Sequence, residues 1–273
     1  MTAMAHLKLL LLLLLWVGIT VSTGVDLHKR VYGGQKCPDT ERLYHVKLKA
    51  TDGKYESLCG GSLIHERWIL TAAHCWENKP GWKMYATLGI HPRQSWIKLL
   101  ADPSLNKKKK VEVTGGSFFV GINTIDDIML LEIPPQPGRK IVALPNCANP
   151  PRIGDVVQVA GLGGYRVNAT GHTRPGQPFN LQCANMHVVD CVPTTRYANC
   201  GAHVPYNNRL CLEEPNVDIR EGDSGGGVIY NNMIYGVISF IPVHVCTGPA
   251  VTVNVCSYMN WINQKINPKS NGK

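Results

Sequence analysis

The chain has 273 residues, of which 44% are hydrophobic and 17% charged, and its formal net charge is +9. These proportions exclude an intrinsically disordered chain, and the length allows one or two globular domains. No nucleic-acid-binding motif occurs in the sequence, so the positive charge indicates acidic partners or a solubilising surface and no nucleic acid is expected.

The first 24 residues are typical of a secretory signal peptide. His6 and Lys8 precede an unbroken apolar run, residues 9–17, and small residues follow up to Gly24. The run is too short for a comfortable membrane span, and no other stretch is long enough. We therefore predict a signal peptide over residues 1–24 and a secreted, extracellular protein without stable membrane insertion. A retained signal anchor is the alternative.

Ten cysteines, an even number, are spread along the chain. In a secreted protein this count predicts a disulfide framework. A structural zinc site would need close ligand pairs such as C-x-x-C, and the sequence has none. We therefore expect neither a metal site nor a cofactor.

Beyond residue 30 the sequence consists of short apolar runs separated by glycine, proline and asparagine, a pattern that predicts an all-β protein. The runs span residues 44–48, 68–71, 127–133, 156–160, 226–230 and 233–240. One helix is predicted at about residues 257–266, because apolar residues recur there at helical spacing. They are Tyr258, Trp261, Ile262 and Ile266.

Prolines are concentrated in residues 134–151, and proline is excluded from central strands. They are Pro134, Pro135, Pro137, Pro145, Pro150 and Pro151. We predict that this segment is the linker between an N-terminal and a C-terminal β unit of roughly 100 residues each.

Three loops carry further signals. Residues 106–110 end in four lysines, which form either a solvated loop or a site for an anionic partner. A glycine-rich segment at 161–164 lacks the full G-x-G-x-x-G pattern, so phosphate binding is not expected. Asn168-Ala169-Thr170 is an acceptor sequence for N-glycosylation and predicts an exposed loop.

Among the ten histidines, His74 is the best candidate for a catalytic base. It follows an apolar strand, and the adjacent Cys75 can hold it in place covalently. A histidine base needs a buried carboxylate that fixes its tautomer and stabilises the imidazolium. Asp127 precedes an apolar run that would bury it, so we favour Asp127, with Asp126 as the alternative.

The sequence Gly222-Asp223-Ser224-Gly225-Gly226-Gly227 places a serine in a glycine turn. Such a turn exposes the hydroxyl and lets the backbone approach a substrate closely. It can also direct the N–H groups of Gly222 and Ser224 at a developing oxyanion. Serine is a poor nucleophile without a base, so this motif depends on the histidine.

The segments around His74, Asp127 and Ser224, in that chain order, resemble the trypsin-like serine proteases of the chymotrypsin fold. The matching stretches are residues 72–75, 127–130 and 222–226. The order differs from those of subtilisin and the α/β-hydrolases. The resemblance covers residues 30–266. It implies two antiparallel six-stranded β-barrels with a C-terminal α-helix. The first barrel spans about 31–133, the second about 152–256, and a tail follows at 267–273.

The resemblance implies a secreted serine endopeptidase, a hydrolase that acts on peptides or proteins. Ser224 attacks the peptide carbonyl while His74 takes its proton, the amides of Gly222 and Ser224 hold the oxyanion, and water then hydrolyses the acyl-enzyme. A protein inhibitor is a further partner of the family, and a monomer is the default expectation.

Residues 30–34 resemble the activation site of the family, so the chain is expected to be an inactive precursor, a zymogen. Cleavage after Arg30 by an activating protease would remove a propeptide, residues 25–30, and free the amine of Val31. In the family this ammonium pairs with the aspartate before the serine, here Asp223. A buried ion pair of this kind orders the oxyanion loop, and loss of one partner is costly.

The resemblance also implies three disulfide pairs, Cys59–Cys75, Cys37–Cys183 and Cys147–Cys256. Four cysteines remain. One pair is expected to join Cys211 to either Cys191 or Cys200, and the other to involve Cys246. The sequence does not decide between these pairings.

The substrate pocket departs from the family pattern. Asp218, six residues before Ser224, matches the residue that binds Arg or Lys in trypsin-like members. Ser239 and Ile241 are expected to line the same pocket, where Ile241 adds bulk. Further departures are Ile219, Arg220, Ala250, Gly227 and Leu162. Two interpretations of Asp218 are open: it binds an Arg or Lys side chain, or it is structural in a shallow pocket that takes small or apolar residues.

Two other functions compete with an active endopeptidase. The altered pocket would suit a binding protein with the protease fold and little or no catalytic activity, although such a protein has no need of all three catalytic residues. A carboxylic-ester hydrolase on another fold is opposed by the order of the motifs.

Overall fold

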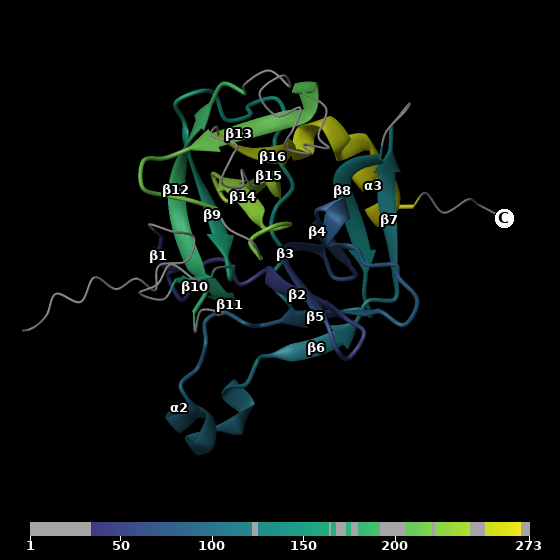
Figure 1. The fold of residues 1–273 in the computed structure, drawn as a ribbon, viewed down its shortest axis with the longest axis vertical. Helices are drawn as coiled ribbons and strands as arrows, with labels where there is room; N and C mark the ends of the chain where they lie inside the picture. Colours follow the sequence, from purple (N-terminus) through teal and green to yellow (C-terminus); the bar gives the residue numbers. More distant parts are fainter. Residues whose placement is uncertain are drawn as a thin grey trace, which may run out of the picture.

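The computed structural model describes residues 34–121, 125–163, 165–167, 173–175, 180–191, 206–219, 222–240 and 249–268. These residues form two antiparallel β-sheets packed side by side (Figure 1). Several predicted features lie outside the described residues. They are the signal peptide and propeptide, Arg30, Val31, Asn168, Cys200, Arg220, Ile241, Cys246 and most of the tail.

The N-terminal sheet has seven strands in the order β6-β5-β2-β3-β4-β8-β7. Their bounds are β2 (His45–Thr51), β3 (Glu56–His65), β4 (Trp68–Thr71), β5 (Lys83–Leu88), β6 (Lys109–Glu112), β7 (Gly115–Val120) and β8 (Ile125–Glu132). Side chains alternate between buried and half-buried along β2, as expected for strands with one face on a core. No pairing among the described strands joins β6 to β7, so this sheet is a half-barrel.

The C-terminal sheet closes into a barrel. Its order is β1-β12-β13-β16-β15-β14-β9, and β9 also pairs with β12. The strands are β1 (Gln35–Lys36), β9 (Val156–Gly161), β12 (Gln182–Val189), β13 (Arg209–Glu213), β14 (Gly227–Tyr230), β15 (Met233–Phe240) and β16 (Ala250–Asn254). Six strands therefore form a ring, to which β1 is added. A separate pair is formed by β10 (Tyr165–Val167) and β11 (Thr173–Pro175). The predicted all-β, trypsin-like fold class is confirmed.

The segment between β8 and β9 contains no strand and touches the second sheet through one bridge, Ala143 to Met233. At the C-terminus, the 3-10 turn η5 (Val255–Tyr258) leads into α3 (Met259–Ile266). This helix reaches the N-terminal sheet: the Phe119 ring makes edge contacts with Tyr258 at 4.9 Å and Trp261 at 5.9 Å between centroids. None of the helices within the described ranges is long and apolar enough to span a bilayer.

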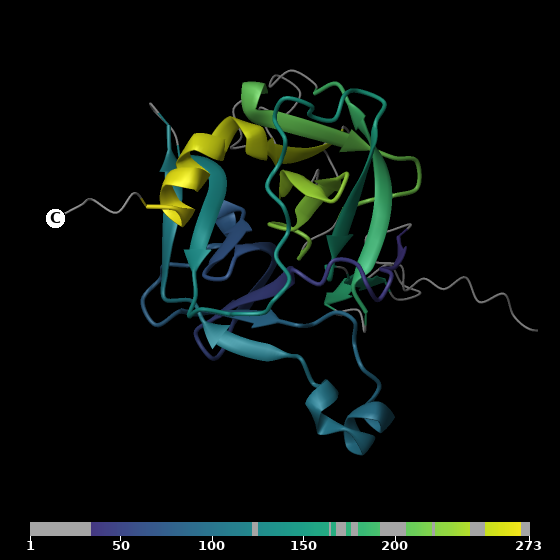
Figure 2. The same cartoon turned by 180° about the vertical axis from the view of Figure 1, so that it is seen from behind.

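A second helix, α2 (Trp96–Ala101), was not predicted from the sequence. It lies with the 3-10 turn η2 (Pro103–Leu105) between β5 and β6, and projects away from both sheets (Figures 1 and 2). Only six residues long, it is too short to show a helical apolar period in the sequence. Ser95 caps it by accepting a hydrogen bond from the Lys98 amide.

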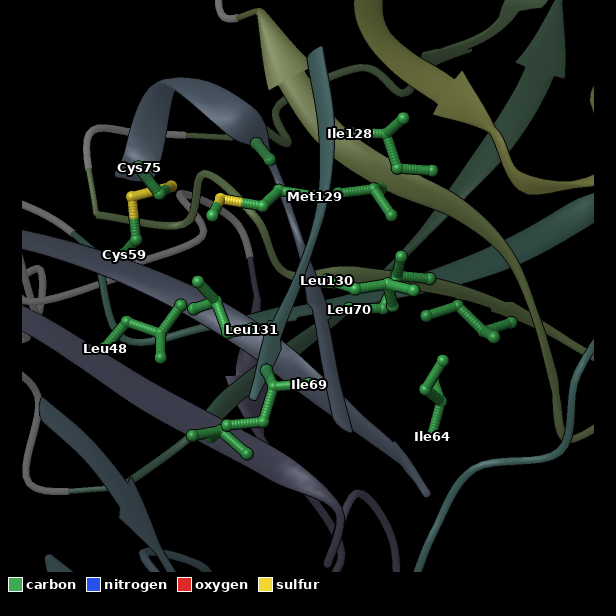
Figure 3. Packing of buried hydrophobic residues seen from close by; sticks show 14 of the residues in the cluster. Leu48, Cys59, Ile64, Ile69, Leu70, Cys75, Ile128, Met129, Leu130 and Leu131 are labelled. Atoms are coloured by element: carbon green, nitrogen blue, oxygen red, sulfur yellow. A yellow bond between two sulfur atoms is a disulfide. The ribbon is translucent and has the colours of Figure 1, made fainter. Parts of the chain in front are cut away.

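The largest apolar core is shared by the two sheets. It includes Leu48, Ile69 and Leu130 of the N-terminal sheet together with Val237 and Val253 of the C-terminal barrel. Figure 3 shows the N-terminal part of this cluster, with the Cys59–Cys75 disulfide at its edge. Three further disulfides are present. They join Cys37 to Cys183, Cys147 to Cys256, and Cys191 to Cys211. Cys211 therefore pairs with Cys191 and not with Cys200.

Candidate active site

His74 and Asp127 are joined by two hydrogen bonds. His74 lies in the 3-10 turn η1 (Ala73–Cys75) directly after β4, and Asp127 lies on the neighbouring strand β8. The backbone N–H of His74 donates to Asp127 Oδ1 at 2.8 Å, and the ring Nδ1 lies 2.8 Å from Oδ2. A ring N–H at Nδ1 donates to the carboxylate, which leaves Nε2 as the acceptor. The pair therefore fixes both the ring orientation and the tautomer of a general base.

The Asp127 carboxylate is buried, with a side-chain exposure of 7% against 43% for His74. Burial alone would raise the pKa of Asp127, but hydrogen bonds from His74 and Ser239 and the charge on His74 hold that pKa below its ordinary value. The Ser239 hydroxyl donates to Oδ2. Ser239, expected in the substrate pocket, is thus itself buried against the catalytic carboxylate.

Asp126, the alternative carboxylate, faces a different partner. Its Oδ2 accepts a hydrogen bond from the Tyr258 hydroxyl at 2.7 Å, and Asn208 donates to that hydroxyl at 3.0 Å. Burial and the neighbouring Asp126 carboxylate raise the pKa of Tyr258. Consecutive residues of a strand point to opposite faces, so only one of the two aspartates can meet the histidine.

Ser224 lies in a turn closed by a hydrogen bond of 2.9 Å from the Gly226 amide to the Asp223 carbonyl. Gly225 adopts a positive φ of 79°, and a Cβ there would overlap Thr71 Oγ1 and the Gly60 carbonyl. The Ser224 carbonyl accepts a hydrogen bond of 2.7 Å from Gly60 on β3. The turn is therefore attached directly to the sheet that carries His74.

The disulfide next to His74 brings the histidine beside the serine turn. Cys75 Sγ lies 3.9 Å from His74 Nε2 and 3.7 Å from the Ser224 carbonyl oxygen. Within the described residues, no hydrogen bond joins Ser224 Oγ to His74 Nε2, and the N–H groups of Gly222 and Ser224 have no acceptor. Catalytic hydrogen bonds are often long before substrate binds, so the arrangement suits a nucleophile and base that engage on binding.

Asp223 is completely buried beneath this turn. Its Oδ1 accepts a hydrogen bond of 2.7 Å from the Gly163 amide. A Cβ at Gly161 would overlap the carboxylate, so the absence of a side chain there is what makes room for it. The Leu162 side chain, where the family commonly has tryptophan, packs against a small cluster that contains the Cys37–Cys183 disulfide.

The residues expected to form the substrate pocket are only partly described. Asp218 is exposed, while the adjacent Ile219 is buried in the core of the C-terminal barrel. Ala250 begins β16 and is half-buried. Arg220 and Ile241 lie outside the described residues, so the far wall of the pocket has no description.

Sequence analysis did not find the contribution of Gly60 or Thr71. The Gly60 amide holds the serine turn, and Thr71 Oγ1 donates to the Gly60 carbonyl at 2.8 Å. The signal available in the sequence was the glycine pair directly after Cys59. One group of potential metal ligands, Cys59, His74 and Cys75, comes together here. Its two sulfur atoms are bonded to each other, so they cannot act as thiolate ligands.

Comparisons with known proteins agree with this geometry. The family model described as Trypsin matches residues 31–262. The thrombin-like enzyme acutin of Deinagkistrodon acutus is 30% identical over 244 residues, which cover 86% of this chain and 95% of the relative. Snake venom serine protease KN3 of Trimeresurus stejnegeri is 32% identical, covering 87% and 88%. Serine protease 1 of Rattus norvegicus is 28% identical, covering 94% and 98%. The chain belongs to the trypsin family of serine endopeptidases.

Proposed function

We propose that the protein hydrolyses peptide bonds through an acyl-enzyme on Ser224. His74 takes the hydroxyl proton as Ser224 attacks the carbonyl and returns it to the leaving amine, and Asp127 stabilises the imidazolium formed between these steps. The N–H groups of Gly222 and Ser224 bind the oxyanion. The observation that carries the proposal is the double hydrogen bond from Asp127 to His74 beside the serine turn.

The chain is made as a zymogen that is activated by cleavage after Arg30. The new ammonium of Val31 then pairs with Asp223, whose complete burial favours such a partner. An Arg30→Gln variant remains uncleaved and inert, and exposure of that variant to trypsin leaves it so. Full activity of this variant would contradict activation at Arg30.

Substrate preference is for Arg or Lys before the cut, through the exposed carboxylate of Asp218. The test is digestion of a mixed peptide library by the chain beginning at Val31, with products identified by mass spectrometry. Cuts after Arg and Lys that are lost in Asp218→Ser support the proposal. Cuts after small or apolar residues show that Asp218 is structural. If folded, processed protein makes no cuts, the protein is a binding protein with the protease fold.

The protein is secreted and carries a glycan on Asn168. The apolar N-terminal run and the acceptor sequence motivate this proposal, and several relatives are named snake venom serine proteases. Protein collected from the medium of expressing cells should lack residues 1–24. Its mass should fall after treatment with an N-glycosidase, and Asn168→Gln should remove that shift.

A further inference from the structure

The segment from residue 89 to residue 110, here called the basic excursion, projects from the N-terminal sheet between β5 and β6 (Figures 1 and 2). It contains one carboxylate, Asp102, which accepts hydrogen bonds from the Ser104 amide and hydroxyl at 3.0 and 2.6 Å. Its cationic residues are Arg93, Lys98, Lys107, Lys108, Lys109 and Lys110. The proposed catalytic mechanism uses none of them.

The positive charges of the basic excursion are poorly compensated. Within the part of the chain that the structure describes, Lys98, Lys107, Lys108 and Lys109 form no ion pair. Burial and the nearby Arg93 charge lower the pKa of Lys108. Lys110 lies over the Tyr85 ring, 3.8 Å from its centroid. A ligand with several negative charges would relieve this repulsion.

A groove of about 490 Å³ runs along the basic excursion. Arg93, Lys107 and Lys108 line it, together with polar Gln94 and Ser95. Its wall is fixed where Gly89 meets the return of the excursion. Gly89 has a φ of 65°, and a Cβ there would overlap the Lys107 carbonyl oxygen. The cations are thus held together by the backbone.

Two large apolar side chains project beside these cations. Ile97 is 61% exposed and Leu100 is 73% exposed. They are three residues apart on α2 and therefore lie on the same face of the helix. Neither lines the groove. The tip of the basic excursion thus combines an unpartnered apolar face with adjacent positive charge.

We propose that the basic excursion is a docking surface for an anionic phospholipid membrane. Ile97 and Leu100 enter the interface, and Arg93, Lys107 and Lys108 contact headgroup phosphates. A second copy of the chain would bring the same positive charges together. An acidic peptide bound in the groove would leave Ile97 and Leu100 in water. A flat anionic surface reaches both the cations and the projecting tip, and holds them reversibly. This inference does not depend on the proposed catalysis.

The test is co-sedimentation of the full chain, made with Ser224→Ala and with its N-terminus established by mass spectrometry, with lipid vesicles. Vesicles of 70% phosphatidylcholine and 30% phosphatidylserine should bind the protein, and pure phosphatidylcholine vesicles should not. Raising the salt to about 0.5 M should release it, because the Debye length falls to a few ångströms.

Substitutions separate the two parts of the surface. Lys107→Gln with Lys108→Gln should lower the partition coefficient about 30-fold, since each lysine near an anionic surface contributes about fivefold. Ile97→Ser with Leu100→Ser should lower it about tenfold or more. The matched control is Lys54→Gln with Lys265→Gln, which removes the same charge from two exposed lysines outside the basic excursion and should leave binding unchanged.

Three outcomes would overturn the proposal. One is equal binding to both kinds of vesicle. Another is an equal loss in the control variant, which would assign binding to net charge alone. The third is failure to bind vesicles while an acidic peptide binds through Lys107 and Lys108, which would make an acidic protein segment the partner. Melting temperatures of all variants establish that each is folded.

Discussion

Asp126 and Asp127 are consecutive carboxylates with different partners. Asp127 accepts both the backbone and the ring N–H of His74, whereas Asp126 accepts the Tyr258 hydroxyl. Both are buried. The negative charge that stabilises the imidazolium through direct hydrogen bonds therefore belongs to Asp127.

Replacing each aspartate by asparagine separates the two roles. Asp127→Asn should lower kcat on a peptide substrate about 10⁴-fold, since an amide favours the wrong histidine tautomer. Asp126→Asn, the matched control, should retain kcat within about tenfold, because its carbonyl can still accept from Tyr258. Steady-state kinetics on the processed chain measures both. A larger loss in Asp126→Asn would contradict the assignment.

His45 is a buried histidine outside the active site. Its pKa falls from 6.5 to about 3, first because of burial and then because of the nearby charges of His91 and Arg42. The unfolded chain therefore binds the proton that the folded chain refuses between these values. The free energy of unfolding should fall by about 1.4 kcal/mol for each pH unit below about 6.5 from this residue alone.

His45→Gln should remove that contribution to the pH slope, because glutamine does not titrate. Denaturant unfolding of both proteins at several pH values between about 4 and 6.5 measures the slopes. The difference in slope is the readout, so an overall loss of stability in the variant does not affect the result. Parallel stability curves would show that His45 is not the source.

At the scale of elements, the serine turn is held by contact with β3 and the end of β4. Gly225 supplies a positive φ in a position where a side chain would overlap Thr71 Oγ1 and the Gly60 carbonyl. Gly154 has a similar φ of 89° but open space around it. The two glycines therefore separate backbone strain from close packing.

Gly225→Ala should displace the serine turn and abolish peptide hydrolysis, with a stability loss above about 2 kcal/mol. Gly154→Ala should cost only about 1 kcal/mol and keep full activity, since it introduces strain alone. Thermal unfolding and kcat/KM measure the two effects. Normal activity in folded Gly225→Ala would mean that the turn is not constrained by this packing.

The strands and the C-terminal helix could be predicted from local patterns, whereas α2 could not. Helix α3 carries Ile262 and its neighbours at helical spacing over two turns. Helix α2 has six residues, and its Ile97 and Leu100 face solvent, so no period set by a core exists there. The strand pattern around Asp126 and Asp127 also left two registers open, because the face that meets His74 is determined by the pairing of β4 with β8.

At the scale of the whole molecule, the C-terminal segment links the two sheets. Tyr258 follows the last strand of the barrel, packs against Phe119 of the N-terminal sheet and donates to Asp126 on β8. The Cys147–Cys256 disulfide joins the same segment to the connection between the sheets. Such contacts join residues more than 100 positions apart. A local sequence pattern predicts the elements but not these long-range partners, and the choice between Cys191 and Cys200 was open for the same reason.

Tyr258→Phe should lower the free energy of unfolding by about 1.5–3 kcal/mol, because it removes a buried hydrogen bond to a carboxylate while the ring still packs. Tyr55→Phe, at an exposed ring, should change it little. Denaturant unfolding measures both. An unchanged stability in Tyr258→Phe would show that the hydroxyl does not help to hold the two sheets together.

The measurement that tests the catalytic assignment most directly is labelling of the chain beginning at Val31 with a fluorophosphonate probe, which reacts with activated serines. The account predicts a single adduct on Ser224, identified by peptide mass spectrometry, which is absent in Ser224→Ala and forms far more slowly in His74→Ala. Labelling that persists in Ser224→Ala, or no labelling of folded and processed protein, would contradict it.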